Sequence, residues 1–236
     1  MKEKPIIGII GRSINKKNKS IITLNEDYRL AIVKSGGIPL IIVPTDILNY
    51  GQTSPNKVGE ISIEARKSLY KILNLCNGIL MTGGSYWYNF DEIVCEYALD
   101  NNIPILGICL GMQILGNIDN FCGDGRSDKT VKNETVINHY QENSLYVHDC
   151  IIKEGLLQNI LNIDRIKVNS RHNFHITKKE FFNIDAYSED GLIEAISFPE
   201  YKFALGVQWH PESMIEYEQY MKKIFDAFIN ASKSNN

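Results

Sequence analysis

The sequence has no stretch of apolar residues long enough to cross a lipid bilayer. Its longest apolar runs, such as Ile38–Val43, which is interrupted by Pro39, fall far short of the about 20 residues that a membrane helix needs. Residues 1–13 hold only one short apolar segment, Pro5–Ile10, before Arg12, so we expect no secretory signal. These features predict a cytoplasmic protein that does not bind membranes.

The sequence also lacks an excess of positive charge. Its 25 basic and 28 acidic side chains give the 236 residues a formal net charge of −3, which excludes the electrostatic footprint of a general nucleic-acid-binding protein. With 44% hydrophobic and 22% charged residues, the composition is that of an ordinary folded protein and not of a disordered chain. We therefore expect no nucleic acid among its partners.

Cysteine is scarce, and the sequence contains no Cys-x-x-Cys pair. The odd number favours reduced, mostly buried thiols over a disulfide framework, and the residues concerned are Cys76, Cys95, Cys109, Cys122 and Cys150. Internal repeats and low-complexity segments are absent too, apart from a polar tail after Ala231, and no linker divides the chain. We predict a single domain over residues 1–236.

Short apolar runs alternate with helical patterns through the first half of the chain. The runs that predict buried strands are Pro5–Ile10, Ile38–Val43, Gly78–Met81 and Ile103–Ile108. Apolar spacings and stop signals predict helices over Glu26–Lys34, Ile61–Leu75, Asp91–Leu99 and Gly111–Gly116. This alternation is typical of βαβ units, whose strands form a parallel sheet covered by helices on both faces.

After Asn117 the pattern changes to shorter strands, which we expect to pair partly antiparallel. They are Thr130–Asn138, Leu145–Lys153, Ile163–Asn169, Phe182–Tyr187 and a last hairpin of Leu192–Phe198 and Phe203–Trp209. A final helix is predicted from apolar residues on one face, namely Met214, Tyr217, Met221, Ile224, Phe225 and Phe228. The predicted fold class is α/β, with a mostly parallel central sheet, helices on both faces and a small, partly antiparallel sheet.

A cysteine between two glycines follows the fourth predicted strand. In Gly107-Ile108-Cys109-Leu110-Gly111 the glycines permit a sharp strand-to-helix turn, which would expose the thiol at the carboxyl end of a strand. The next helix points its N-terminus at Cys109 and so favours the reactive thiolate. The pentapeptide alone predicts equally well a small cysteine buried between packing glycines.

A histidine and a glutamate lie two residues apart at the end of the last predicted strand. On an extended segment the side chains of His210 and Glu212 leave the same face, where the carboxylate can orient the imidazole and stabilise its protonated form. Together with Cys109 they supply a nucleophile, a base and an orienting group, the minimum for acyl transfer. His210 by itself is as readily a strand-end histidine next to a solvated glutamate.

Two further glycines follow the third predicted strand. In Met81-Thr82-Gly83-Gly84-Ser85 they let the backbone turn with its amides free, and such amides can stabilise an oxyanion. Without the other motifs, an ordinary tight turn is the better interpretation of this segment.

Three motifs together, TGG at 82–84, GICLGMQ at 107–113 and GVQWHPE at 206–212, resemble those of the class I glutamine amidotransferase-like superfamily. The similarity extends to EDYRLAIVKSGGIPLIIVP at 26–44, VNSRHNF at 168–174, DGLIEAI at 190–196 and FALGVQWHPE at 203–212. It covers nearly the whole chain and is closest to the gamma-glutamyl hydrolase branch, peptidase C26, which includes gamma-glutamyl-gamma-aminobutyrate hydrolases.

The resemblance implies a flavodoxin-like sheet and a Cys–His–Glu catalytic triad. In this sequence the triad would be Cys109, His210 and Glu212. The resemblance also implies an oxyanion hole formed by the backbone amides of Gly84 and Leu110.

The same resemblance implies a substrate pocket. Gln113 would lie near the glutamyl group, and Asn169, Ser170 and His172 match a loop that lines the pocket. Arg171, in that loop, could meet the phosphates of a nucleotide leaving group. The alternatives are a solvated helix position for Gln113, an ordinary loop histidine at His172 and a solvated Arg171.

The function implied is hydrolysis of a gamma-glutamyl amide bond of a small molecule through a cysteine thioester, without cofactor or metal. The substrate suggested first is gamma-glutamyl-CDP-amidate, from the biosynthesis of the phosphoramidate of bacterial capsules. Gamma-glutamyl-gamma-aminobutyrate comes next. The alternative is a glutaminase subunit that sends ammonia to a synthase partner. The sequence is also compatible with a homodimer.

The segment after the double glycine departs from the hydrolase pattern. Relatives of the aminobutyrate type have a longer stretch before the nucleophile strand, whereas here only residues 85–102 intervene. The aromatic run Tyr86–Phe90 has two equally supported interpretations. One is a lid or stacking surface for a flat group such as a nucleobase, and the other is a loop packed on the core.

Other residues that could bear chemistry lack a pattern that assigns it. His139 and His148, with Asp149, do not have the ligand spacing of a zinc site, so we expect structural roles for them. Cys122 and Cys150 have no base nearby in the sequence and are likewise expected to be structural.

Overall fold

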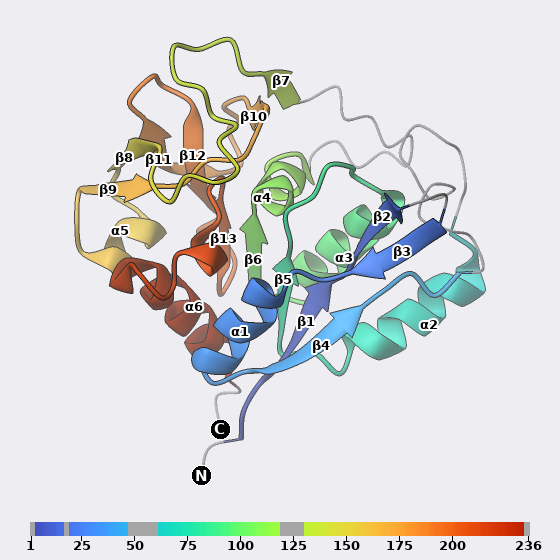
Figure 1. Ribbon diagram of the computed structural model, residues 1–236. Coiled ribbons are helices and arrows are strands. Elements are labelled where there is room, and N and C mark those ends of the chain that lie inside the picture. The colour runs from blue at the N-terminus through green and yellow to red at the C-terminus, as the bar shows by residue number, and fades with distance from the viewer. Residues whose placement is uncertain (1–2, 17–18, 47–60, 119–129, 234–236) are drawn as a thin grey trace.

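The computed structural model describes residues 3–16, 19–46, 61–118 and 130–233. These residues form a nine-stranded sheet with helices on both faces, together with two small two-stranded sheets (Figure 1). In spatial order the strands of the large sheet are β4 (Ile38–Ile42), β1 (Ile6–Ile10), β5 (Gly78–Met81), β6 (Ile105–Ile108), β13 (Ala204–Val207), β12 (Ile193–Ser197), β11 (Asn183–Ser188), β8 (His148–Ile152) and β9 (Arg165–Val168).

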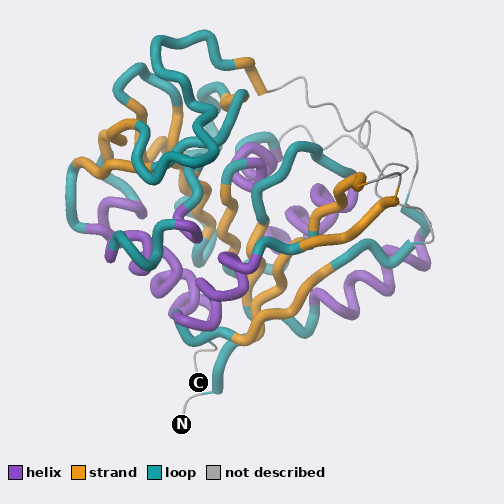
Figure 2. The backbone as a smooth tube through the Cα atoms, in the orientation of Figure 1, coloured by secondary structure: helices purple, strands orange, loops and turns teal. Residues whose placement is uncertain are grey.

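The half of the sheet from β4 to β13 is parallel, as predicted. Six α-helices cover the sheet in the described part of the chain, and they are α1 (Glu26–Lys34), α2 (Ile63–Leu73), α3 (Asn89–Asp100), α4 (Leu110–Leu115), α5 (Leu156–Leu161) and α6 (Gln219–Ser232). Buried side chains of α2, α3 and α4 join one apolar cluster, and those of α1, α5 and α6 join a second cluster on the opposite face. Figure 2 shows these two helical layers with the strands between them. The core is therefore divided by the sheet, as in a doubly wound fold.

The strands β12, β11, β8 and β9 continue the large sheet antiparallel to one another. The small sheets lie apart from it, and they pair β2 (Arg12–Lys16) with β3 (Lys19–Thr23) and β7 (Thr130–Lys132) with β10 (Phe174–Ile176). The β2–β3 hairpin, α5 and β10 were not predicted. The hairpin side chains are mostly exposed, so no apolar run marks it in the sequence.

Several boundaries differ from the sequence prediction by one to three residues, and two differ by more. The strand predicted over Thr130–Asn138 is only the three-residue β7. The last helix begins at Gln219, because Glu218 caps it by accepting a hydrogen bond from the backbone N–H of Tyr220. Met214 and Tyr217, which were assigned to that helix, lie in the turn before it. Met214 is fully buried, whereas Tyr217 is exposed.

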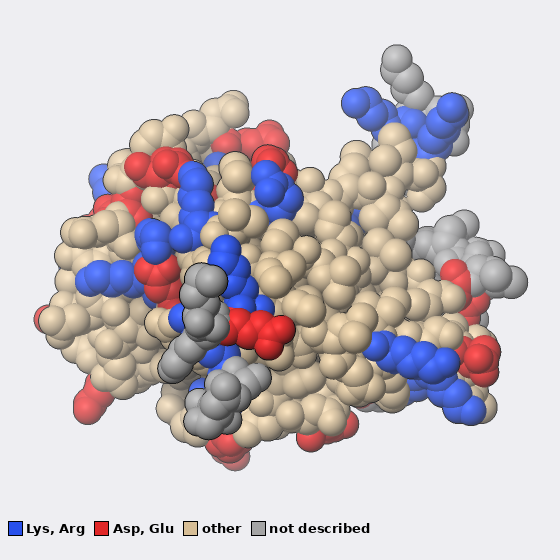
Figure 3. All heavy atoms as spheres, turned by 90° about the horizontal axis from the view of Figure 1, so that it is seen from below, with Lys and Arg blue, Asp and Glu red and all other residues tan. Residues whose placement is uncertain are grey.

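The described part of the chain bears on three features: membrane-spanning helices, surface charge and thiols. No helix in the described ranges is long and apolar enough to cross a membrane. On the face in Figure 3, Lys and Arg are interspersed with Asp and Glu. Four cysteines, Cys76, Cys95, Cys109 and Cys150, are free and buried, and Cys122 lies outside the described residues.

Candidate active site

The backbone at Cys109 makes a sharp turn between β6 and α4. Its φ of 54° and ψ of −108° are unusual for a residue with a side chain, and they hold the thiol at the carboxyl end of the strand. A Cβ on Gly111 would clash with the carbonyl oxygen of Met81, and one on Gly107 would lie 2.6 Å from the backbone of Gly111. The two glycines are therefore required by close packing around the cysteine.

His210 and Glu212 follow β13, the strand next to β6, and so reach the same edge of the sheet as Cys109. His210 Nδ1 lies 2.7 Å from Glu212 Oε1, and Glu212 is only 3% exposed. Gly83 lies between the two halves of the site, since a Cβ placed there would be 2.8 Å from His210 Cε1 and 3.4 Å from Cys109 Cβ. The structure thus brings the predicted nucleophile, base and carboxylate together.

The charges of this group stabilise one another. Burial favours a neutral Cys109 thiol, but the charge of His210 and its hydrogen bond outweigh burial and lower the pKa of the thiol. Burial likewise lowers the pKa of His210, but the Glu212 carboxylate and the Cys109 thiolate raise it to about 10. Both shifts favour the pair of a Cys109 thiolate and a His210 imidazolium.

Asn169 holds the backbone of His210. The N–H of His210 donates to Asn169 Oδ1 at 2.8 Å, and Asn169 Nδ2 donates to the carbonyl oxygen of His210 at 2.9 Å and to Ser213 Oγ at 3.0 Å. Asn169 is fully buried. Its geometry is that of a positioning residue behind His210.

The Thr82–Gly84 turn follows β5 and is held by two side chains that the sequence analysis did not single out. The backbone N–H of Gly83 donates to the hydroxyl oxygen of Tyr28 at 2.9 Å. Arg12 donates from Nη2 to the Thr82 carbonyl oxygen at 2.8 Å and pairs through Nη1 with Asp91 at 2.6 Å. Tyr28 thus occupies the Gly83 amide, while the next residue, Gly84, lines the pocket of Cys109.

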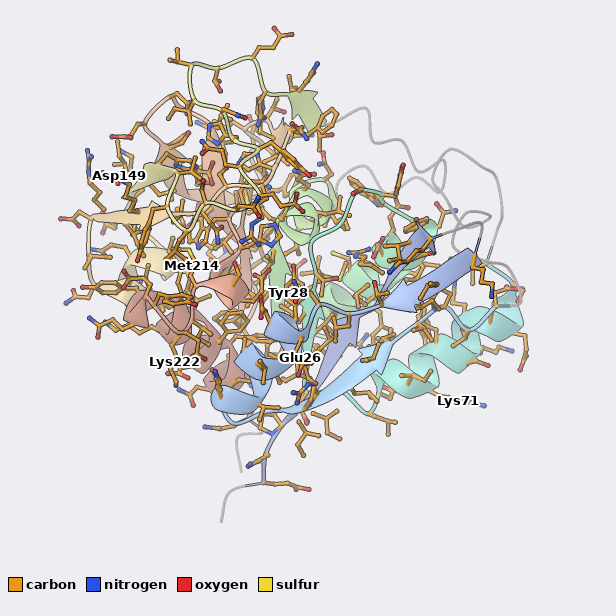
Figure 4. All side chains as sticks on the ribbon, viewed as in Figure 1. Glu26, Tyr28, Lys71, Asp149, Met214 and Lys222 are labelled. Carbon is orange, nitrogen blue, oxygen red and sulfur yellow. The ribbon has the colours of Figure 1, made fainter. Side chains whose placement is uncertain are left out.

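Tyr28 connects this turn to the histidine. It lies at the start of α1, close to the ends of the central strands (Figure 4), and its hydroxyl is 3.5 Å from His210 Nδ1. Burial and then the nearby Glu212 carboxylate raise its pKa well above the usual value, so the hydroxyl keeps its proton. In the sequence Tyr28 had the spacing of a core residue on a helix, and nothing local marked its hydroxyl as part of the site.

A pocket of about 340 Å³ opens beside Cys109. Its walls include Gly84, Leu110, Gln113, Arg171 and His172, five of the residues predicted to form the oxyanion hole or to bind substrate. The amide of Leu110 hydrogen-bonds the thiol and contributes to its lowered pKa.

Two predicted substrate residues, Asn169 and Ser170, are not among the residues that line this pocket. Asn169 and Ser170 are fully buried, and Ser170 Oγ lies 3.1 Å from His139 Nδ1.

Gln113 Nε2 donates to the carbonyl oxygen of Phe174 at 2.9 Å and to Gln208 Oε1 at 3.2 Å. Gln113 is therefore a buried wall residue and not a solvated helix position.

The aromatic run after the double glycine divides between two roles. Tyr86 is 69% exposed and lies at the pocket, where its ring is accessible. Trp87 lines the pocket but is largely buried, while Tyr88 and Phe90 pack in the core. Of the predicted stacking surface, Tyr86 is the one exposed ring.

A second group of ionisable side chains adjoins this pocket. His139, His148, His172 and Glu194 are buried with their potential ligand atoms close together. The sequence analysis treated His139 and His148 as structural, because their own spacing did not suggest a site. The structure adds His172 and Glu194 from other segments of the chain.

Comparison with known proteins agrees with this architecture. Residues 88–212 match the family model Peptidase C26. The Schizosaccharomyces pombe protein named "Putative glutamine amidotransferase PB2B2.05" is 32% identical over 253 residues, which cover 95% of this chain and 87% of that protein. The Escherichia coli gamma-glutamyl-gamma-aminobutyrate hydrolase PuuD is 28% identical over 256 residues, covering 96% and 93%.

A solved structure shares the fold. The glutaminase domain of Trypanosoma brucei CTPS with bound acivicin superposes with a TM-score of 0.63 at 17% identity, covering 98% of this chain and 96% of that one. The sheet and its flanking helices thus define a class I glutamine amidotransferase-like fold. Within that class, the chain belongs to the Peptidase C26 family.

Proposed function

We propose that this protein hydrolyses a gamma-glutamyl amide bond of a small molecule through a thioester on Cys109. The observation that carries the proposal is the group of Cys109, His210 and Glu212 beside a pocket whose wall includes Gly84 and Leu110, the residues expected to supply the oxyanion amides. Membership of the Peptidase C26 family supports the hydrolase class.

In the first half of the reaction the Cys109 thiolate attacks the gamma-carbonyl carbon, and the carbonyl electron pair moves to oxygen. The amides of Gly84 and Leu110 stabilise that oxyanion. When the oxyanion collapses, the carbon–nitrogen bond breaks and the His210 imidazolium donates its proton to the leaving nitrogen. The glutamyl group stays on Cys109 as a thioester.

In the second half, neutral His210 takes a proton from water, and the hydroxide adds to the thioester carbonyl. Collapse of this second oxyanion breaks the carbon–sulfur bond and releases glutamate together with the Cys109 thiolate. His210 is again an imidazolium, stabilised by Glu212. The cycle consumes one water and needs no further reactant.

For the leaving group we propose the CDP-amidate of capsular phosphoramidate biosynthesis. Arg171 lies on the pocket wall, and its buried Nε has no hydrogen-bond partner among the described residues, which supports an anionic ligand. Tyr86 offers an exposed ring for a nucleobase. A second hollow of about 870 Å³ shares residues 84–86 with this pocket and provides room for a large leaving group.

Two other candidates have support from the comparisons. The name of the Escherichia coli relative favours gamma-glutamyl-gamma-aminobutyrate as substrate. The match to a glutaminase domain favours a glutaminase that supplies ammonia to a synthase partner. The room around Arg171 and Tyr86 favours the nucleotide substrate over both.

The test is glutamate release by the purified protein from gamma-glutamyl-CDP-amidate, gamma-glutamyl-gamma-aminobutyrate and glutamine, with Cys109→Ser as control. We expect kcat/KM to be at least about 100-fold higher for the nucleotide substrate. Mass spectrometry of quenched enzyme should find a glutamyl adduct on the Cys109 peptide.

An adduct on Cys76, Cys95 or Cys150 would refute the assignment of the nucleophile. Activity on glutamine alone that rises when cell extract is added would favour the glutaminase. Preference for the aminobutyrate amide would retain the reaction and overturn the proposed leaving group.

A further inference from the structure

Four buried side chains point their potential ligand atoms at one spot next to the catalytic pocket. These atoms of His139, His148, His172 and Glu194 all lie within 4.8 Å of one another. His139 Nδ1, His148 Nε2 and His172 Nε2 are 3.7, 3.6 and 3.4 Å from the same oxygen, Glu194 Oε1. None of the four residues is more than 3% exposed.

The other nitrogen of each imidazole lies near an oxygen outside this group. The pairs are His139 Nε2 with the Asp190 carboxylate at 3.1 Å, His148 Nδ1 with the carbonyl oxygen of Asp149 at 3.3 Å, and His172 Nδ1 with the carbonyl oxygen of Phe174 at 3.1 Å. Such a bond places the proton on the outer nitrogen and leaves a lone pair on the inner one. Histidines that bind metal ions are held in this way.

The inner atoms have few partners of their own. Among the described residues, His148 Nε2, His172 Nε2 and both carboxylate oxygens of Glu194 are buried without a hydrogen bond. A buried carboxylate in this condition is costly unless a positive charge compensates it. The Glu194 carboxylate therefore needs a positive charge beside it to offset its burial.

We propose that these residues form a binding site for one divalent transition-metal ion, with zinc as the best fit. The ligands are His139 Nδ1, His148 Nε2, His172 Nε2 and Glu194 Oε1. Ligand atoms about 2.1 Å from a tetrahedral ion lie about 3.4 Å apart, close to the three distances from Glu194. Three imidazoles and one carboxylate suit zinc and exclude the hard ions magnesium and calcium.

Metal binding requires one local change. Ser170 Oγ lies 3.1 Å from His139 Nδ1 and competes for the same lone pair. The Ser170 hydroxyl must rotate its proton away when the ion binds. The Asp190 carboxylate on the far side of His139 stays in place and increases the basicity of the ring.

The site joins segments that are far apart in the sequence. His148 begins β8, Glu194 lies within β12, and His139 and His172 lie in the loops after β7 and β9. His172 is also part of the wall of the Cys109 pocket. With all four positions taken by protein, the ion has no place for substrate, and its role is to hold this wall rigid.

The test counts metal in purified protein and does not depend on the proposed reaction. It uses the Cys109→Ser protein, because the Cys109–His210 pair could itself capture zinc. After removal of metal with a chelator, zinc is added and excess is removed by desalting. We expect about one zinc per chain, a rise in Tm of about 5–10 °C, and visible absorption of a tetrahedral site when cobalt(II) replaces zinc.

Two variants locate the ion. Glu194→Gln in the same background should retain less than about one tenth of the zinc and lose the rise in Tm, because the charged ligand is gone. His175→Ala is the matched control and should bind as the parent does, since His175 is a half-buried histidine outside the group.

The competing occupant is a proton shared between the imidazoles and Glu194. No retained zinc, no Tm rise and no cobalt spectrum in the Cys109→Ser protein would favour that proton and overturn the proposal. This result rests on the folded parent and holds even if Glu194→Gln fails to fold. Equal zinc in Glu194→Gln would place the ion elsewhere and also refute the site.

Discussion

The side chain of Asn169 is hydrogen-bonded to both backbone groups of His210, accepting from the N–H at 2.8 Å and donating to the carbonyl oxygen at 2.9 Å. The orientation of the imidazole therefore depends on a residue from the loop after β9 as well as on Glu212. Asn169 is fully buried and His210 is partly buried, so little water competes for these hydrogen bonds.

Asn169→Ala should lower kcat about 10–100-fold, because His210, the proton-transfer group, loses its position. KM should change little, because the wall of the pocket stays in place. The unfolding free energy should fall by about 1–3 kcal/mol, since buried backbone groups of His210 lose their partners. Ser213→Ala is the control, because it removes a hydroxyl that bonds Asn169 and the His210 carbonyl oxygen but keeps both bonds from Asn169 to the His210 backbone. Steady-state kinetics and denaturant unfolding measure the two effects. A change in KM alone would assign Asn169 to substrate binding.

Tyr28→Phe should reduce kcat about 10-fold. Without the hydroxyl, the Gly83 amide loses its acceptor and the Thr82–Gly84 turn is free to present a different amide to the oxyanion. Tyr97→Phe is the matched control, since it removes a hydrogen bond to Asn74 away from the site. If both variants lost stability equally and neither lost kcat, Tyr28 would have a purely structural role.

Glu212→Gln should move the alkaline limb of the rate profile to lower pH. Burial lowers the pKa of His210, but Glu212 and the Cys109 thiolate outweigh burial and raise it from 6.5 to about 10. The wild-type rate should therefore fall as pH rises through about 10, when the imidazolium is lost. The raised pKa of His210 also contributes to the stability of the folded state. This stabilisation is fully present below pH 6.5 and is lost as pH rises through about 10.

The measurements are kcat/KM and Tm as functions of pH for wild type, Glu212→Gln and the exposed control Glu200→Gln. In Glu212→Gln both transitions should shift down by about one pH unit or more. Profiles that coincide for all three proteins would show that Glu212 does not set the charge of His210.

Tyr86→Ala and Arg171→Ala should each raise KM about 10–100-fold for a nucleotide-bearing substrate, through lost stacking and lost phosphate contacts. The KM for a small gamma-glutamyl amide should stay unchanged. The control is Arg165→Ala, whose side chain is 57% exposed and bound to Asp149 away from the pocket. Equal losses on both substrates would indicate general destabilisation, and no loss on either would place the leaving group elsewhere.

The parallel half of the sheet was largely predictable from the sequence. Gly78–Met81 has the predicted ends, and Ile38–Ile42 differs from its prediction by one residue. Strands buried between two helical layers are apolar on both faces, so they stand out as continuous apolar runs. The β2–β3 hairpin has no continuous apolar run, because its side chains are mostly exposed. The six-residue α5 is too short to show a clear helical period in the sequence.

What the sequence by itself determined is the set of groups whose neighbours lie within a few residues. The close contact of Gly107 with Gly111 and the pairing of His210 with Glu212 are local, because each joins positions within four residues of one another. The His210–Glu212 pair is formed by the 3-10 turn Pro211–Ser213 and not by the strand alternation that was predicted. Only the tertiary structure decided which distant groups complete the site. Asn169 reaches His210 across 41 positions and Tyr28 reaches Gly83 across 55, since the order of strands in the sheet, which no local pattern encodes, brings their loops to one edge.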